Sequence, residues 1–206
     1  MKYKFTKNWF GSEEQIEDLK SILPDNNLEI HLLEIGSFEG RSSVWFLDNL
    51  LTNKKSTITC LDPWMDYSQD EKSLNSYDSE ESQWKFGTDK IIDTFLYNIE
   101  ASGFSDKVIV ERGISTKILP KLLVNENKYD IIFIDGNHVA PFVLMDAVLS
   151  WDLLKVGGIM IFDDYLWMPE RYKSLTPKIA VDSFIEVFED YNDVILNRYR
   201  KVIRKK

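Results

Sequence analysis

Three aspartates in the second half of the chain have the residue type and spacing of a divalent-cation site. Asp135 follows an apolar run at residues 131–134, and Asp163 and Asp164 follow another at residues 157–162. Such runs are typical of buried parallel strands, whose carboxyl ends meet at one edge of a sheet. Carboxylates that are close together repel one another, and a hard cation with oxygen ligands would neutralise them. The alternative is that one or two of them cap turns while the others face solvent.

His138 lies three residues after Asp135, at the expected start of a helix, and is a candidate general base. An imidazole titrates near neutral pH, so beside a metal-bound hydroxyl it could accept a proton. The alternative is a histidine that caps or packs against the helix. The other histidine, His31, is expected to be a core or surface residue, and the single cysteine, Cys60, a buried strand residue.

The segment EIGSFEGRSS, residues 34–43, places two glycines at a turn from a strand into a helix. Gly36 and Gly40 let the backbone approach a ligand closely, and the following helix offers free N–H groups to an anion. The spacing is G-x-x-x-G, whereas the dinucleotide fingerprint is G-x-G-x-x-G, and Ser37 and Phe38 break that pattern. The alternative is a tight turn with a purely structural role.

Two further strand ends carry candidate binding residues. Asp62 can accept hydrogen bonds from ribose hydroxyls, or it can be a cap or turn aspartate. Trp64 can stack on a ligand or pack in the core. Gly113 allows close approach after the third strand, and Ser115 is predicted to cap the next helix.

These residues require a scaffold in which strands and helices alternate. Strands are predicted at residues 28–35, 57–61, 107–111, 131–134 and 157–162, with a closing hairpin at 194–196 and 201–203. Helices are predicted at residues 12–23, 42–51, 91–101, 115–123, 139–154 and 182–188. This alternation predicts an α/β fold with a doubly wound parallel sheet covered on both faces.

The chain is predicted to form one domain, residues 1–206. Residues 1–25 would be an N-terminal helical cap, in which Ser12 and Gln15 have the spacing of a capping box. The polar, acidic segment 66–83 is either a solvated loop or a mobile lid over the ligand.

Composition narrows the class of protein. The formal net charge of −9, from 34 acidic and 25 basic residues, disfavours general nucleic-acid binding. We see no secretory signal and no apolar run near the roughly 20 residues that span a bilayer, which predicts a cytoplasmic protein without a membrane partner. A basic C-terminal stretch is expected to be a solvated strand and tail: Arg198, Arg200, Lys201, Arg204, Lys205 and Lys206.

Taken in order, EIGSFEGRSS, LDPW, YDIIFIDGNH and LLKVGGIMIFDDY resemble the class I methyltransferases that use S-adenosylmethionine. The resemblance is greatest to the metal-dependent small-molecule O-methyltransferases of the catechol and macrocin type, methyltransferase family 24, and it covers residue 28 to the C-terminus. It implies a Rossmann-like seven-stranded sheet, mostly parallel, with an antiparallel C-terminal hairpin. It also implies S-adenosylmethionine and a divalent cation such as Mg²⁺ as cofactors, and a small-molecule or sugar hydroxyl as acceptor.

The resemblance also implies roles for particular residues. His138 and Asp135 would be catalytic, with His138 as the base. The metal ligands would be Asp135, Asp163 and Asp164, although catechol-type members commonly have Asn at the third position. The cofactor contacts would be Glu34, Gly36, Ser37, Phe38, Gly40, Ser42, Asp62, Trp64, Gly113, Ser115 and Asp135. A homodimer is one expectation for its assembly.

Three other functions compete with this interpretation. A nucleotide-cofactor oxidoreductase would share the sheet, but the G-x-x-x-G spacing argues against it. A non-catalytic protein could keep both the fold and the cofactor pocket. A methyltransferase of a macromolecule such as RNA would use the basic C-terminal stretch.

Overall fold

The computed structural model describes residues 2–65, 90–167 and 176–206. The lid expected at residues 66–83 lies outside these described residues. The strands are β1 (His31–Ile35), β2 (Thr57–Asp62), β3 (Val108–Arg112), β4 (Tyr129–Ile134), β5 (Leu154–Phe162), β6 (Asn192–Asn197) and β7 (Lys201–Lys205). The α-helices of the described residues are α1 (Glu13–Ile22), α2 (Arg41–Asn49), α3 (Lys90–Ser102), α4 (Ser115–Val124), α5 (Ala140–Trp151) and α6 (Pro177–Val187).

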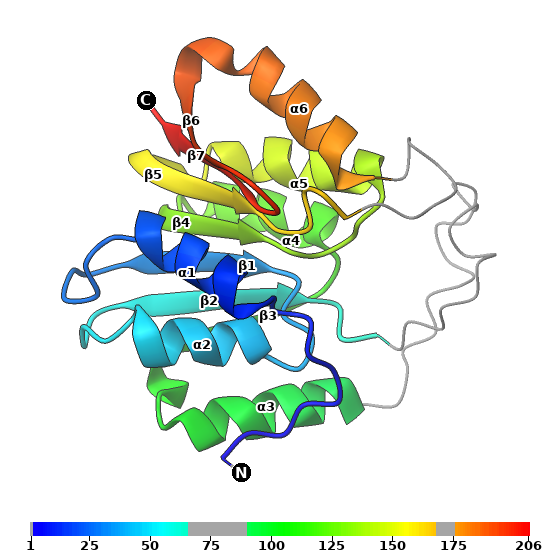
Figure 1. Cartoon of the computed structure of the whole chain (residues 1–206). Coiled ribbons are helices and arrows are strands. Elements are labelled where there is room, and N and C mark those ends of the chain that lie inside the picture. Colours follow the sequence, from blue (N-terminus) through cyan, green and yellow to red (C-terminus); the bar gives the residue numbers. More distant parts are fainter. Residues whose placement is uncertain (1, 66–89, 168–175) are drawn as a thin grey trace.

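The strands form one seven-stranded sheet in the order β3-β2-β1-β4-β5-β7-β6 (Figure 1). The strands from β3 to β5 in this order are parallel to one another, and β7 is antiparallel to both β5 and β6. The predicted doubly wound sheet with a C-terminal antiparallel hairpin is therefore confirmed.

Apolar side chains cover both faces of the sheet because side chains alternate along each strand. Phe133 and Ile161 face the side on which α1, α2 and α3 lie, where they join one buried cluster. Ile134 and Phe162 face the opposite side, where α4, α5 and α6 complete a second cluster (Figure 1). A strand buried on both faces cannot keep a polar side, which explains the continuous apolar runs in the sequence.

The helix and strand ends differ from the sequence-based predictions where apolar residues run on without a break. The helix predicted to reach residue 154 ends at Trp151, since Leu154 already pairs with Tyr129 in the sheet. Helix α6 begins at Pro177 rather than at residue 182, because proline presets the backbone angle of a first helical turn. The predicted capping box between Ser12 and Gln15 is confirmed at the start of α1.

None of the helices in the described part of the chain combines the length and the apolar character that a bilayer crossing demands.

Candidate active site

The predicted site residues lie together at the carboxyl edge of the sheet. The strand order reverses between β1 and β4, because β1 is followed by β2 on one side while β4 lies on the other. Open α/β sheets bind ligands outside such a switch point. The loops that follow β1, β2, β4 and β5 all end at this edge.

Gly36 lies where the loop after β1 touches the loop after β4. Its φ is +92°, and a Cβ atom there would be 2.2 Å from the Asp135 carbonyl oxygen and 2.6 Å from the Gly136 Cα. Only glycine tolerates both the backbone angle and the contact. The turn after β1 and the Asp135 loop are therefore in direct backbone contact, which joins the two halves of the predicted site.

Glu34 is fully buried beneath this turn. Its carboxylate accepts hydrogen bonds from the Ser37 Oγ at 2.7 Å, the Ser42 Oγ at 2.5 Å and the Ser43 Oγ. Burial raises the pKa of Glu34, although the three hydroxyls partly offset this rise. In this structure Glu34 anchors the turn to α2, and cofactor contacts of Glu34 and Ser42 stay predictions.

Asp62 also binds the turn after β1. Its Oδ2 accepts from the backbone N–H groups of Ser37 and Phe38, both at 3.0 Å, and its Oδ1 accepts from that of Trp64 at 2.5 Å. Burial raises the pKa of Asp62 above its ordinary value, and the hydrogen bonds from these N–H groups only partly offset the rise. The Trp64 ring packs on Phe95 with ring centroids 4.8 Å apart, so it takes the core-packing alternative here. A ribose contact of Asp62 stays a prediction.

Asp135, His138 and Asp164 form a cluster in which one potential ligand atom of each lies within 4.8 Å of the others. The His138 Nε2 is 2.6 Å from the Asp164 Oδ2, and the Tyr199 hydroxyl donates to the Asp164 Oδ1. Burial opposes ionisation of Asp164, but the hydrogen bonds from His138 and Tyr199 outweigh it, so the pKa of Asp164 lies below its ordinary value. The prediction did not include Tyr199.

Asp135 carries the least compensated charge of this cluster. Burial raises its pKa well above the ordinary value, and the charges of Asp163, Asp164 and Glu34 raise it further, while Arg200 lowers it. The carboxylates of Asp135 and Asp164 offer oxygen atoms, which are the donors that Mg²⁺ and Mn²⁺ prefer, and His138 lies beside them.

Asp163 does not join the cluster, because its carboxylate pairs with Arg200. The Arg200 Nε lies 2.7 Å from the Asp163 Oδ1, and the two side chains are only 2% and 3% exposed. The guanidinium also donates to the backbone carbonyls of Phe10 at 2.6 Å and Gln15 at 2.9 Å. The sequence pattern predicts a solvated basic tail here, which is wrong for Arg200 and for Lys201, because both are buried.

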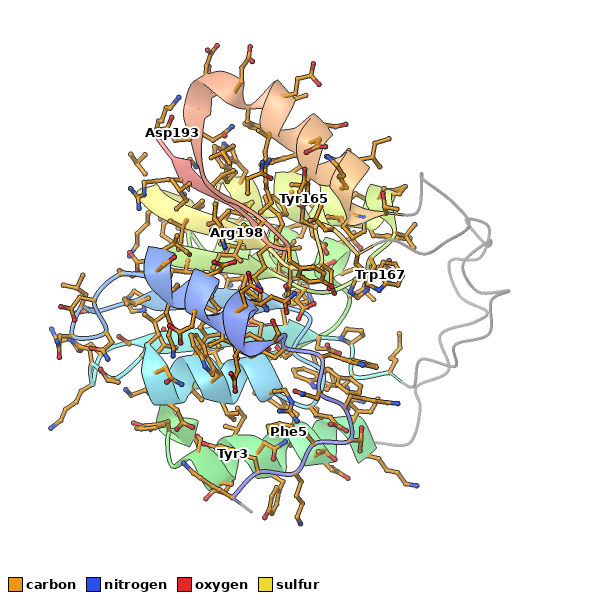
Figure 2. All side chains as sticks on the ribbon, in the orientation of Figure 1. Tyr3, Phe5, Tyr165, Trp167, Asp193 and Arg198 are labelled. Atoms are coloured by element: carbon orange, nitrogen blue, oxygen red, sulfur yellow. The ribbon has the colours of Figure 1, made fainter. Side chains whose placement is uncertain are left out.

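Arg198, in the same turn between β6 and β7 as Arg200, contacts α1. The Arg198 guanidinium lies 3.2 Å from Asp18, and Figure 2 shows Arg198 beside this helix. Arg198 is largely exposed, whereas Arg200 is buried, so the two arginines on either side of Tyr199 have different roles. The turn between β6 and β7 therefore connects the N-terminal helix to the carboxyl edge of the sheet.

Two exposed tryptophans border the site. Trp167 is 41% exposed and its ring centroid lies 5.1 Å from that of His138; its place at this edge is labelled in Figure 2. Trp9 is 60% exposed and stacks on Phe38 of the turn after β1, with centroids 5.2 Å apart. Exposed aromatic rings next to polar chemistry suit the binding of a flat or ring-shaped molecule.

The loop after β3 differs from its prediction. Ile114 is the residue before α4, and it makes no side-chain cap, so the prediction that Ser115 caps this helix is wrong. Ser115 is instead the first helical residue and is hydrogen-bonded to Asp146 of α5. Gly113 and Ser115 stay predictions as cofactor contacts.

Asp146 gives the protein a testable pH dependence. It is 2% exposed, and its Oδ1 has no hydrogen-bond partner among the described residues. Burial raises its pKa from 3.8 to about 7, against the lowering by Ser115. A raised pKa means that stability is lost as the pH rises toward and through about 7. Asp146→Asn should therefore stabilise the protein more at pH 8 than at pH 5. The two changes in the free energy of unfolding should differ by a few kcal/mol.

Urea unfolding at both pH values measures this difference. The exposed Asp152, which follows the same helix, provides the control, because Asp152→Asn removes the same charge without any burial. If Asp146→Asn changes the free energy of unfolding equally at pH 5 and pH 8, the buried carboxylate does not cause the pH dependence of stability.

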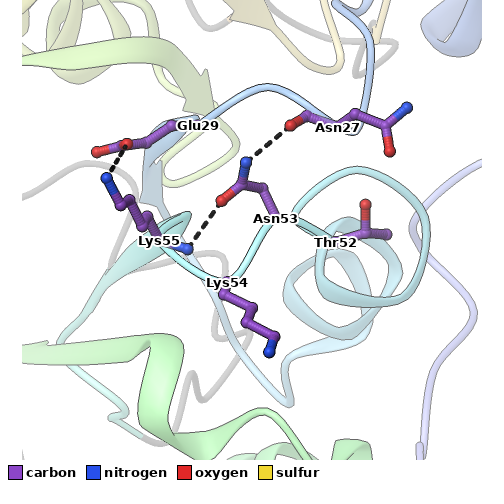
Figure 3. Close-up of a pocket in the computed structure, with 6 residues that line it drawn as sticks. All are labelled: Asn27, Glu29, Thr52, Asn53, Lys54 and Lys55. Carbon is purple, nitrogen blue, oxygen red and sulfur yellow. Dashed lines mark hydrogen bonds and ion pairs between the residues drawn. The ribbon is translucent and has the colours of Figure 1, made fainter.

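A hollow of about 480 Å³ lies elsewhere and is distinct from this site (Figure 3). Its lining is polar and includes the Glu29–Lys55 ion pair at 3.7 Å. Residues that precede β1 and β2 form it, so it lies at the amino ends of the strands, opposite the carboxylates.

Comparisons with known proteins agree with this geometry. A family model described as a methyltransferase domain matches residues 33–165. An uncharacterized protein of Acanthamoeba polyphaga mimivirus is 27% identical over 175 residues, which are 83% of this chain and 68% of that protein.

Two solved structures share the fold. The O-methyltransferase TomG of Streptomyces achromogenes, involved in tomaymycin synthesis and solved with S-adenosylmethionine, has a TM-score of 0.60 at 16% identity, covering 85% of this chain and 73% of TomG. The methyltransferase MycE of the mycinamycin pathway, solved with Mg, S-adenosylhomocysteine and mycinamycin VI, has a TM-score of 0.61 at 15% identity. That match covers 96% of this chain and 50% of MycE, so the chain spans half of MycE.

Proposed function

Because this chain belongs to the methyltransferase domain family, whose model matches residues 33–165, we propose that it transfers a methyl group from S-adenosylmethionine to a hydroxyl of a small molecule or sugar. The observation that carries this proposal is the backbone contact between the Gly36 turn and the Asp135 loop, beside a carboxylate–histidine cluster. The structural similarity to TomG, which was solved with S-adenosylmethionine, supports the choice of cofactor.

The cofactor carries a cationic sulfonium and an ammonium group, and the uncompensated Asp135 carboxylate suits such a ligand. We expect the methionine part to lie against the turn from Gly36 to Gly40, where glycine allows close approach. The adenosyl part would then extend toward Asp62 and Ser115 on the side of β2 and β3.

Methyl transfer demands an acceptor oxygen in line with the methyl group, so it depends chiefly on positioning. We propose that Asp135 and Asp164 hold a divalent cation. That MycE, which shares the fold, was solved with Mg supports the proposal. A cation bound there would orient the acceptor hydroxyl and lower its pKa. The exposed rings of Trp9 and Trp167 would cover the acceptor and exclude water.

His138 is the proposed base. With ionised Asp164 accepting a hydrogen bond from the His138 Nε2, the proton of the neutral ring lies on Nε2 and the lone pair on Nδ1. The Nδ1 can then take the hydroxyl proton while Asp164 stabilises the resulting imidazolium, as a carboxylate does in other His–Asp pairs.

Titration calorimetry with S-adenosylhomocysteine, with and without Mg²⁺, tests the cofactor site. We expect micromolar binding, because the site combines close backbone approach with a complementary charge. No binding under either condition would contradict the proposal. Binding without turnover on a panel of hydroxylated compounds would instead favour a non-catalytic cofactor-binding protein.

Two glycine variants form a matched control. Gly36 and Gly157 both have positive φ, +92° and +81°, so alanine strains the backbone similarly at each. A Cβ at Gly157 meets nothing within 4 Å, whereas one at Gly36 meets the Asp135 loop. Gly36→Ala should lose S-adenosylhomocysteine binding and Gly157→Ala should keep it, provided that both variants melt cooperatively.

A further inference from the structure

The turn between β6 and β7 contacts two adjacent aspartates at the end of β5. The antiparallel register of β5 and β7, continued past its last pair, places Arg200 opposite Asp163 and Tyr199 opposite Asp164. The side-chain contacts follow this register: Arg200 pairs with Asp163 at 2.7 Å, and Tyr199 donates to Asp164. One turn therefore gives each aspartate a different partner.

The two aspartates also differ in direction. Asp163 continues the side-chain alternation of Ile161, which faces the cluster containing Phe10 on the side of α1 to α3. Its side chain is 3% exposed. Asp164 has a left-handed backbone, with φ of +51°, and its side chain is 21% exposed beside His138. Asp163 thus faces the interior and Asp164 faces the cluster.

The Arg200 guanidinium uses all three of its nitrogens within the protein. Its Nε forms an ion pair with the Asp163 Oδ1 at 2.7 Å without hydrogen-bond geometry, and its Nη2 donates to the Asp163 Oδ2 at 3.3 Å. Nη2 and Nη1 also donate to the carbonyls of Phe10 and Gln15. An arginine cannot lose its proton in a protein, so this is a permanent buried cation. Drawing Asp163 toward a metal would leave that cation unpaired, which buried charges do not tolerate.

We propose that Arg200 excludes Asp163 from the cation site, and that Asp135 and Asp164 alone supply its carboxylate ligands. This assignment rests on the proposed metal-assisted methyl transfer, and it differs from the three-aspartate set that the resemblance implies. The charges agree with it: the Asp163–Arg200 pair is neutral, so the two remaining carboxylates match the charge of one divalent cation. Arg200 is a positioning residue in this arrangement, and it also fixes the N-terminal segment through Phe10 and Gln15.

Replacing both members of the pair tests the assignment without leaving a buried charge behind. Asp163→Asn with Arg200→Gln keeps the pair polar, and Asp163→Leu with Arg200→Met replaces it by apolar side chains, which buried ion pairs often tolerate. Binding of Mn²⁺ would be measured by electron paramagnetic resonance in the presence of S-adenosylhomocysteine. Asp164→Asn serves as the comparison that removes an assigned ligand.

We expect whichever double variant melts cooperatively to bind Mn²⁺ almost as tightly as the wild type, and Asp164→Asn to bind about tenfold or more weakly. A loss in the double variant as large as that of Asp164→Asn would overturn the assignment. Anomalous diffraction from Mn²⁺ in wild-type crystals decides the question without any variant: an ion within about 2.6 Å of an Asp163 oxygen overturns it.

The two proposals fail in different ways. A wild type that binds S-adenosylhomocysteine but no Mn²⁺ overturns the ligand assignment and leaves the cofactor site standing. A wild type that binds neither overturns both.

Discussion

Replacing His138 by glutamine should lower turnover by about 10²–10⁴-fold, the usual contribution of a general base, while affinity for S-adenosylhomocysteine changes little. Glutamine keeps a donor for the Asp164 carboxylate, which lies 2.6 Å from the His138 Nε2, but it cannot take a proton near neutral pH. The His138 side chain is 39% exposed, so the change leaves the core intact. Single-turnover rates and calorimetry on the same preparation separate the two effects.

The other histidine is a matched control for this prediction. His31 lies in β1, where its Nδ1 contacts the Thr57 hydroxyl at 2.8 Å, at the start of the strand and away from the carboxyl edge. His31→Gln should leave turnover unchanged. An unchanged rate in His138→Gln would remove His138 as the base, and an equal loss in both variants would indicate a general structural effect.

The fold could be predicted because its signals are local and repeated. Apolar runs such as residues 131–134 and 157–162 specify buried strands, and the helices between them make a parallel sheet the consistent solution. Helix ends were predictable where a cap marks them, as at Ser12. The end of α5 was not predictable, because apolar residues continue from α5 into β5. A buried helix end and a buried strand start have the same composition.

The edge that carries the site could also be predicted, because the carboxyl ends of parallel strands must coincide. The roles of individual acids there could not be predicted from residue type. Glu34 and Asp62 bind hydroxyl and backbone N–H groups of their own chain, and a ligand would use the same acceptors. A strand-end carboxylate is therefore compatible with either role until its partners are known.

The role of Asp163 depends on a partner that is distant in the sequence. Its ion pair depends on Arg200, which is 37 residues away in sequence and reaches Asp163 only after β7 pairs with β5. The sequence did contain a signal for this pair. Arg200 lies two residues before Val202, and Asp163 lies two residues after Ile161, so side-chain alternation places both on the sheet face where Val202 and Ile161 are buried. That signal becomes usable only once the order of the last strands is known.

Asp135→Asn should have opposite effects on function and stability. Burial and the charges of Asp163, Asp164 and Glu34 disfavour the ionised Asp135, whose pKa is well above its ordinary value. Removing that charge should increase the free energy of unfolding of the metal-free protein at pH 8 by about 1 kcal/mol or more. The same change should weaken Mn²⁺ binding by about 10–100-fold and lower turnover with it, because an assigned ligand is lost.

Thermal unfolding with and without Mn²⁺ measures both the gain in stability and the loss of Mn²⁺ binding in one experiment. In EDTA the variant should melt above the wild type, and with excess Mn²⁺ only the wild type should gain, since a ligand stabilises the folded state that binds it. A variant that melts below the wild type in EDTA would mean that Asp135 holds the two loops together through contacts rather than repelling its neighbours. The expected result would mean that the fold tolerates a destabilising carboxylate because the cation and the cofactor compensate it, as functional sites often lower stability in exchange for activity.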